Sequence, residues 1–154
     1  MTVLVVIILL VVNYRYSLLV AVSNILASEF TQLLKHTVFE DALRPKKFFE
    51  GVHDLYFVPG VENYSYHSFP SGHSTSAFAL YFALTLIVED KFMKGVFFTI
   101  ALLVGYSRVY LSQHFFGDIY AGSLIGVIIT LITYWAIQKI NTPWMDRSLI
   151  SSFK

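Results

Sequence analysis

Long apolar segments, separated by shorter stretches that hold most of the charges, constrain this chain more than any other feature of its sequence. Five such segments run through it, at residues 1–12, 18–34, 74–88, 96–111 and 119–140. Only 14% of the residues are charged, whereas soluble domains carry about 25%. We therefore expect a bilayer as the solvent, and the sequence predicts an all-α integral membrane bundle of about five transmembrane helices.

The first two segments differ from simple membrane spans. Residues 1–12 would extend about 18 Å as a helix, short of the roughly 30 Å hydrocarbon core, so we interpret them as the end of a span that is truncated or starts late. They show no basic n-region and no clear cleavage site, which argues against a signal peptide. Glu29 in the second segment is a candidate functional residue. Pairing with a neighbouring helix, or a position near the interface, explains it equally well.

Charge, cysteine content and length narrow the possible functions. The net charge of +1 argues against a nucleic-acid partner, and the length suits a single domain over residues 1–154. The sequence contains no cysteine, so disulfide bonds, thiolate catalysis and cysteine-ligated metals are excluded. Other polar side chains must therefore supply any chemistry.

Residues 35–69 form a long polar segment between the second and third apolar segments. Its many aromatic residues favour an ordered cap at the membrane interface, where amphipathic rings prefer to lie. Three histidines, His36, His53 and His67, could suggest a metal site. Their separations of 17 and 14 residues match no ligand pattern, so we expect no metal.

Polar and charged side chains that could take part in catalysis gather in the stretch Ser107–Asp118, which is otherwise surrounded by apolar residues. His114 and Asp118 are four residues apart, so in a helix they would lie on one face. The carboxylate could then fix the imidazole tautomer and leave the other ring nitrogen free for chemistry. Arg108 adds a permanent planar cation suited to phosphate oxygens. A buried structural His–Asp pair beside an arginine that reaches toward water is the alternative.

A second polar motif, Pro70-Ser71-Gly72-His73, opens the third apolar segment. Ser71 is a plausible N-cap, and Gly72 allows the backbone to approach a ligand closely. The N–H groups and the positive dipole end of a helix that begins here would favour an anion. Taken alone, the motif is explained better by an ordinary capped helix start with a chance histidine.

Successive membrane crossings place these polar groups on one side of the bilayer. The end of the second segment, the long polar segment, the start of the third, the end of the fourth and the start of the fifth all fall there. Lys35, His73, Arg108, His114 and Asp118 therefore converge at one depth. This convergence favours a phosphate-handling site over an isolated structural pair.

The motifs resemble those of the type 2 phosphatidic acid phosphatase and vanadium haloperoxidase superfamily. Ser107-Arg108, His114 and Asp118 have the spacing of its third signature, and residues 70–73 are similar to its second. Lys35 followed by Arg44-Pro45 looks like the first signature, although eight residues intervene where the family has six. The resemblance covers about residues 34–134. The family usually has six membrane helices, where this sequence predicts five.

The resemblance implies a membrane phosphatase that hydrolyses a lipid phosphate or pyrophosphate monoester without metal or cofactor. It implies that His114 attacks phosphorus to form a phosphohistidine, that Asp118 orients His114, and that His73 protonates the leaving alkoxide and then serves as base. The implied phosphate-binding residues are Lys35, Arg44, Ser71, Gly72 and Arg108. Phosphatidic acid, phosphatidylglycerol phosphate, undecaprenyl pyrophosphate and a lipid A phosphate are all admissible substrates. A lipid phosphotransferase with the same site and a non-catalytic anion-binding membrane protein are the alternatives.

The distribution of cations predicts which side of the membrane the site faces. The face opposite the site carries cations in short segments near span ends, namely Arg15, Lys91, Lys94, Lys139, Arg147 and Lys154. On the site face, Lys46 and Lys47 remain once the cations implied for phosphate binding are set aside. Because short-loop Lys and Arg favour the cytoplasm, we expect the site on the periplasmic or extracytoplasmic face.

Overall fold

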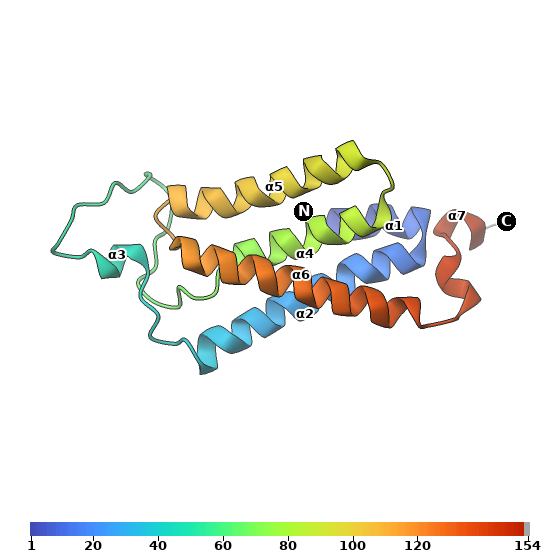
Figure 1. Ribbon diagram of the computed structural model, residues 1–154, viewed down its shortest axis with the longest axis horizontal. Helices are drawn as coiled ribbons and strands as arrows, with labels where there is room; N and C mark the ends of the chain where they lie inside the picture. Colours follow the sequence, from blue (N-terminus) through green and yellow to red (C-terminus); the bar gives the residue numbers. More distant parts are fainter. Residues whose placement is uncertain (153–154) are drawn as a thin grey trace.

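The computed structural model describes the backbone of residues 1–152 and the side chains of residues 1–150, so Lys154 lies outside the described residues. The described chain is helical, and Figure 1 shows its long helices running side by side. In chain order the elements are α1 (Thr2–Val12), α2 (Tyr14–Thr37), α3 (Pro45–Phe48), α4 (Gly72–Ile87), α5 (Lys91–Tyr110), α6 (Phe116–Gln138), the 3-10 helix η1 (Pro143–Asp146) and α7 (Leu149–Ser152). This arrangement confirms the predicted all-α membrane bundle.

Each predicted apolar segment forms one helix, with ends that differ by a few residues from the apolar boundaries. Among the described residues, α2, α5 and α6 are long and apolar enough to cross a membrane, with 24, 20 and 23 residues. The helix α4 has 16 residues and α1 has 11. The shorter α4 packs against α2, α5 and α6, so it is the central helix of the bundle and is mostly shielded from lipid.

Polar side chains cap the N-terminal ends of α2 and α5. Asn13 alone separates α1 from α2, and its side chain accepts a hydrogen bond from the backbone N–H of Arg15 at 2.8 Å. Asp90 caps α5 in the same way through the N–H of Met93 at 2.7 Å. Such caps satisfy backbone donors that would otherwise be unpaired at a helix start.

Two glycines allow α6 to lie directly against α4. A Cβ atom at Gly122 would come within 2.5 Å of the Ser71 carbonyl oxygen, and one at Gly126 would come within 2.5 Å of the Thr75 carbonyl oxygen. The backbone N–H of Ser71 also donates to the carbonyl of Asp118 at 2.9 Å. This close contact brings the N-termini of α4 and α6 together at one end of the bundle (Figure 1).

The opposite end of the bundle is closed by Arg15. Its guanidinium forms a two-point ion pair with Asp146, at 2.7 and 3.0 Å. The same group donates to the carbonyls of Ile137 and Ile140 at the end of α6, at 2.8 and 3.1 Å. Arg15 therefore ties the C-terminal segment to the α1–α2 turn and adds side-chain donors to two carbonyls at the end of α6 and just after it.

We expect Gly126→Ala to destabilise the bundle because the added methyl group would collide with the α4 backbone. Overpacking of this kind costs about 1–3 kcal/mol. The measurement is thermal unfolding in detergent, followed by circular dichroism. Gly95→Ala is the matched control, since Gly95 lies in α5 with nothing within 4 Å of its added Cβ. Equal unfolding midpoints for the two variants would contradict the close α4–α6 contact.

Candidate active site

A polar cavity lies at the end of the bundle where α2 ends and α4 and α6 begin. It has a volume of about 330 Å³. Its lining combines residues from α2, the long loop, α4 and the α5–α6 connection, namely Ser28, Gln32, Lys35, Arg44, Tyr64, Gly72, His73, Ser76, Gln113 and His114. Five residues singled out from the sequence are therefore brought together around one space: Lys35, Arg44, Gly72, His73 and His114.

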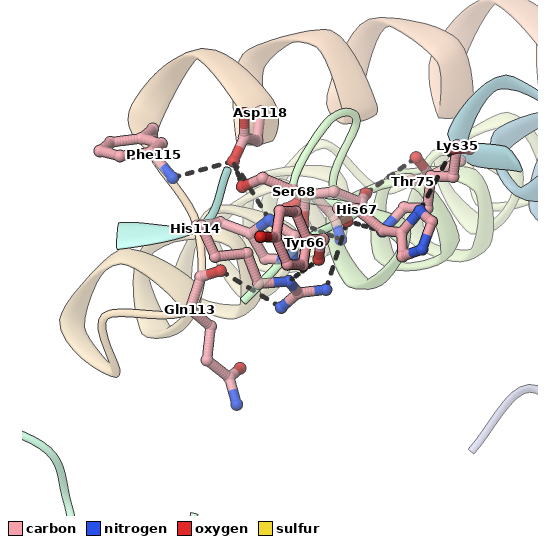
Figure 2. Close-up of polar contacts among 12 residues, drawn as sticks. Lys35, Tyr66, His67, Ser68, Thr75, Gln113, His114, Phe115 and Asp118 are labelled. Carbon is pink, nitrogen blue, oxygen red and sulfur yellow. Dashed lines mark hydrogen bonds and ion pairs between the residues drawn. The ribbon is translucent and has the colours of Figure 1, made fainter. Parts of the chain in front are cut away.

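His114, which lines this cavity, forms a buried pair with Asp118 (Figure 2). The Nδ1 atom of His114 lies 3.2 Å from Oδ2 of Asp118, and the two residues are only 3% and 5% exposed. The pair does not lie within one helix, because His114 belongs to the α5–α6 connection and Asp118 to the first turn of α6. The contact still forms, since the chain turns into α6 directly after His114.

The Oδ2 atom of Asp118 is held by two further donors. It accepts a hydrogen bond from the backbone N–H of Phe115 at 3.0 Å and a short one from the hydroxyl of Ser68. Ser68 is 1% exposed and comes from the loop before α4, 50 residues away in sequence. These bonds fix the carboxylate, which in turn orients the His114 ring and directs its Nδ1 away from the cavity.

The surroundings of His114 favour its neutral form. Burial lowers the pKa of His114, and although the hydrogen bond to Asp118 opposes this shift, the positive charges of Arg44 and Lys35 add to it. A neutral ring that donates from Nδ1 to Asp118 carries a lone pair on Nε2. That neutral form is the one in which an imidazole can act as a nucleophile.

Two cations meet at one carbonyl of the long loop. The Nζ atom of Lys35 donates to the carbonyl of His67 at 3.1 Å, and Nη2 of Arg44 donates to the same oxygen at 3.4 Å. Arg44 also donates to the carbonyls of Tyr66 at 2.9 Å and Gln113 at 3.3 Å. The eight residues between Lys35 and Arg44 thus do not prevent these side chains from lining the same cavity.

The start of α4 has the geometry of a capped helix. The Ser71 hydroxyl accepts a hydrogen bond from the N–H of Ser74 at 3.4 Å and another from the Ser74 hydroxyl at 3.1 Å. Ser71 is fully buried and lies outside the cavity lining, whereas Gly72 and the exposed His73 line the cavity. The first residues of α4 therefore present a helix N-terminus to the cavity.

Arg108 reaches the site through Gln113. Its Nη1 atom donates to the side-chain carbonyl of Gln113 at 3.0 Å, and Nε donates to the Ser107 hydroxyl at 3.1 Å. Gln113 in turn donates from its amide to the carbonyl of Glu62 at 3.1 Å. Because the backbone carbonyl of Gln113 accepts from Arg44, this residue connects both arginines and the long loop.

Sequence reasoning missed three contributors to this site: Ser68, Gln113 and Tyr64. The Tyr64 ring lies 5.5 Å from the Arg44 guanidinium carbon, a cation–π distance. Ser68 lies two residues before the motif at residues 70–73, and Gln113 directly precedes His114. Their positions beside two motifs are the signal that could have drawn attention to them.

The side chains of the other candidates from the sequence do not line the cavity. Glu29 is exposed on the outer face of α2, and the rings of His36 and His67 lie 4.9 Å apart. His53 contacts Phe49 instead, at 6.0 Å between ring centres. Within the described residues, no group of three or more His, Cys, Asp and Glu is placed so that it could hold a metal ion.

The fold and the cavity define a helical membrane protein with a cationic site beside a buried His–Asp pair. Comparison with known families agrees with this class. Residues 3–142 match the PAP2 superfamily. The chain therefore belongs to the PAP2 superfamily.

Several relatives are named as lipid phosphatases. The chain is 36% identical over 94 residues to phosphatidylglycerophosphatase B of Bacillus subtilis, a match that covers 55% of this chain and 46% of that protein. It is 30% identical over 82 residues to the lipid A 4'-phosphatase of Porphyromonas gingivalis, covering 53% and 35%. The chain thus spans less than half the length of either relative.

A solved structure with the same fold is that of Aquifex aeolicus LpxE. It superimposes with a TM-score of 0.71 at 29% sequence identity, covering 84% of this chain and 73% of that chain. The similarity therefore extends across the bundle and is not confined to the site motifs.

The groups that surround His114 allow its pKa to be predicted. We expect its pKa to lie below the ordinary value of about 6.5. Arg44→Gln should raise this pKa because a nearby positive charge is lost, and Asp118→Asn should lower it further because the opposing carboxylate charge is lost. NMR of histidine-labelled protein in detergent micelles would measure these values, with His114→Gln identifying the resonance. A fall in the pKa on Arg44→Gln would contradict the proximity of the two groups.

Proposed function

We propose that this chain is a lipid phosphate phosphatase that hydrolyses a phosphate or pyrophosphate monoester through a phosphohistidine at His114. The observation that carries the proposal is the buried His114–Asp118 pair at the wall of a cavity that Lys35 and Arg44 also line. The names of the relatives support lipid phosphates as the class of substrate. The apolar helices support a site that meets its substrate at the membrane surface.

The reaction divides into two displacements at phosphorus. In the first, Nε2 of His114 attacks, the bond between phosphorus and the lipid oxygen breaks, and His73 donates a proton to the leaving oxygen. In the second, water attacks the phosphohistidine, His73 accepts a proton from it, and the P–N bond breaks to release inorganic phosphate. Asp118 stabilises the positive charge that His114 acquires when it attacks.

Positive charge around the cavity would stabilise the transferring phosphoryl group. Phosphoryl transfer depends mainly on positioning and charge stabilisation. Lys35 and Arg44 would contact the phosphate oxygens, together with backbone N–H groups at Gly72 and the start of α4. Arg108, which is hydrogen-bonded to the Gln113 side chain, would add its positive charge nearby. Ser71 would hold the first turn of α4 in place as its N-cap. With these groups the site needs no metal ion.

Phosphate release from lipid phosphates, measured with purified protein in detergent and EDTA, tests this proposal. His114→Ala should lower kcat by about a thousandfold or more, as removal of a nucleophile does in other hydrolases, and His73→Ala should also be severely impaired. His53→Ala is the control, since His53 is an exposed loop residue outside the cavity lining. Activity retained by His114→Ala would refute the nucleophile, and activity lost in EDTA and restored by zinc or magnesium would refute metal independence.

We propose that the site faces the periplasm or the cell exterior. The end of the bundle opposite the cavity carries most of the cations outside the site, namely Arg15, Lys91, Lys94, Lys139 and Arg147. The cavity end retains Lys46 and Lys47, and the structure pairs Lys47 with Glu50. Because cations in short loops favour the cytoplasm, this distribution supports a cytoplasmic position for the far end.

A labelling experiment tests the orientation, because the chain has no cysteine of its own. Asp54→Cys introduces a thiol at an exposed position of the long loop, and Asn141→Cys introduces one at an exposed position after α6. Intact cells treated with a membrane-impermeant maleimide should label Asp54→Cys only, and permeabilised cells should label both variants. Labelling of Asn141→Cys but not of Asp54→Cys in intact cells would show the reverse orientation.

A further inference from the structure

From Lys35, near the C-terminal end of α2, the cavity extends along a polar face of this helix toward the middle of the helix. Ser28, Gln32 and Lys35 lie on one side of this helix, since they are spaced as i, i+4 and i+7, and all three line the cavity. At the rise of an α-helix, Gln32 lies about 4.5 Å and Ser28 about 10 Å below Lys35 along the axis of α2. The part of a lipid just below its phosphate would therefore lie beside hydroxyl and amide groups.

These two side chains differ from their polar neighbours because they have no partner. Among the residues that the structure describes, neither the Ser28 hydroxyl nor the Gln32 amide makes a hydrogen bond. Nearby, Ser76 donates to Asn24 at 2.7 Å and Thr31 donates to Thr75 at 3.1 Å. Ser76 and Thr31 are thus paired across the contact between α2 and α4, whereas Ser28 and Gln32 line the cavity and are available to a ligand.

Beyond Ser28 the surroundings become apolar. Ser28 also lines a second cavity of about 340 Å³ between α1 and α2. Its walls are mostly aliphatic, with Val3, Val6, Ile7, Ala21 and Ile25, and they also include Thr2, Asn24 and Glu29. The order of environments from the bundle end inward is therefore cationic, then neutral and polar, then apolar. A lipid with the same order of groups along its length would be complementary to it.

We propose that the substrate carries hydrogen-bonding groups, such as ester or amide carbonyls or hydroxyls, within about 10 Å of its phosphate. A diacylglycerol phosphate or an acylated sugar phosphate has such groups, whereas a polyprenyl phosphate has only hydrocarbon there. Gln32 and Ser28 donate to the carbonyl oxygens of the bound lipid. A hydrocarbon chain at this position would offer no acceptor to the half-buried Ser28 hydroxyl or to the exposed Gln32 amide, and sites that hydrogen-bond a substrate discriminate against analogues that lack the bonded group. This inference rests on the proposed phosphatase function.

The test compares three substrates of matched chain length: a diester phosphatidic acid, its diether analogue without carbonyls, and a polyprenyl phosphate. We expect the wild-type protein to hydrolyse the diester with a kcat/KM about tenfold above that of the diether, the value of two hydrogen bonds, and to act least on the polyprenyl phosphate. A Ser28→Ala, Gln32→Leu double variant should lose the preference for the diester and keep its activity on the diether. Gln138→Leu, the same change at an exposed site at the end of α6, should keep the preference.

The outcomes separate this inference from the proposed function. No phosphate release from any lipid by the wild-type protein would refute the function and the inference together. An active wild-type protein without a preference for the diester, or a double variant that still prefers the diester, would overturn the inference alone. Activity on the diether reports folding of the double variant. If the double variant is inactive on both lipids, the single variant Ser28→Ala, which removes one hydroxyl, replaces it in the test. A reduced preference for the diester over the diether in this variant would support the inference, and an unchanged preference would overturn it.

Discussion

The close approach of α4 and α6 is the constraint on which the rest of the structure depends. Backbone meets backbone at Gly122 and Gly126, and the N–H of Ser71 bonds to the carbonyl of Asp118. This contact places two helix N-termini side by side at one end of the bundle. Because each helix N-terminus carries partial positive charge, an anion is favoured there before any charged side chain contributes.

Loop backbone then arranges the cations around that region. Lys35 and Arg44 donate to one carbonyl, that of His67, whose φ of 56° lies in a region that residues other than glycine adopt infrequently. Such backbone conformations cluster at functional sites. Two like charges this close repel each other, and an anion bound between them relieves that repulsion. The long loop is therefore part of the site as well as its cover.

Membership of the PAP2 superfamily describes the bundle and the type of site, and the substrate depends on other residues. One fold can serve many substrates, so specificity must be argued from the groups that contact the ligand. In this chain the groups that we propose to select the substrate are Ser28 and Gln32, which share one face of α2 with Lys35 and line the cavity. The catalytic proposal and the substrate inference thus concern two levels of one cavity.

The sequence by itself determined the helices, the membrane environment and most of the candidate site. Apolar runs and capping residues are local signals, and the spacing of His114 and Asp118 brings them together across one chain turn. The tertiary structure alone decided that Ser68 holds Asp118, that Gln113 connects Arg44 and Arg108, and that Ser71 is buried outside the cavity lining. It also decided which polar groups of α2 are paired with α4. These contacts join residues far apart in the chain, and local periodicity carries no information about which distant helix or loop will be the neighbour.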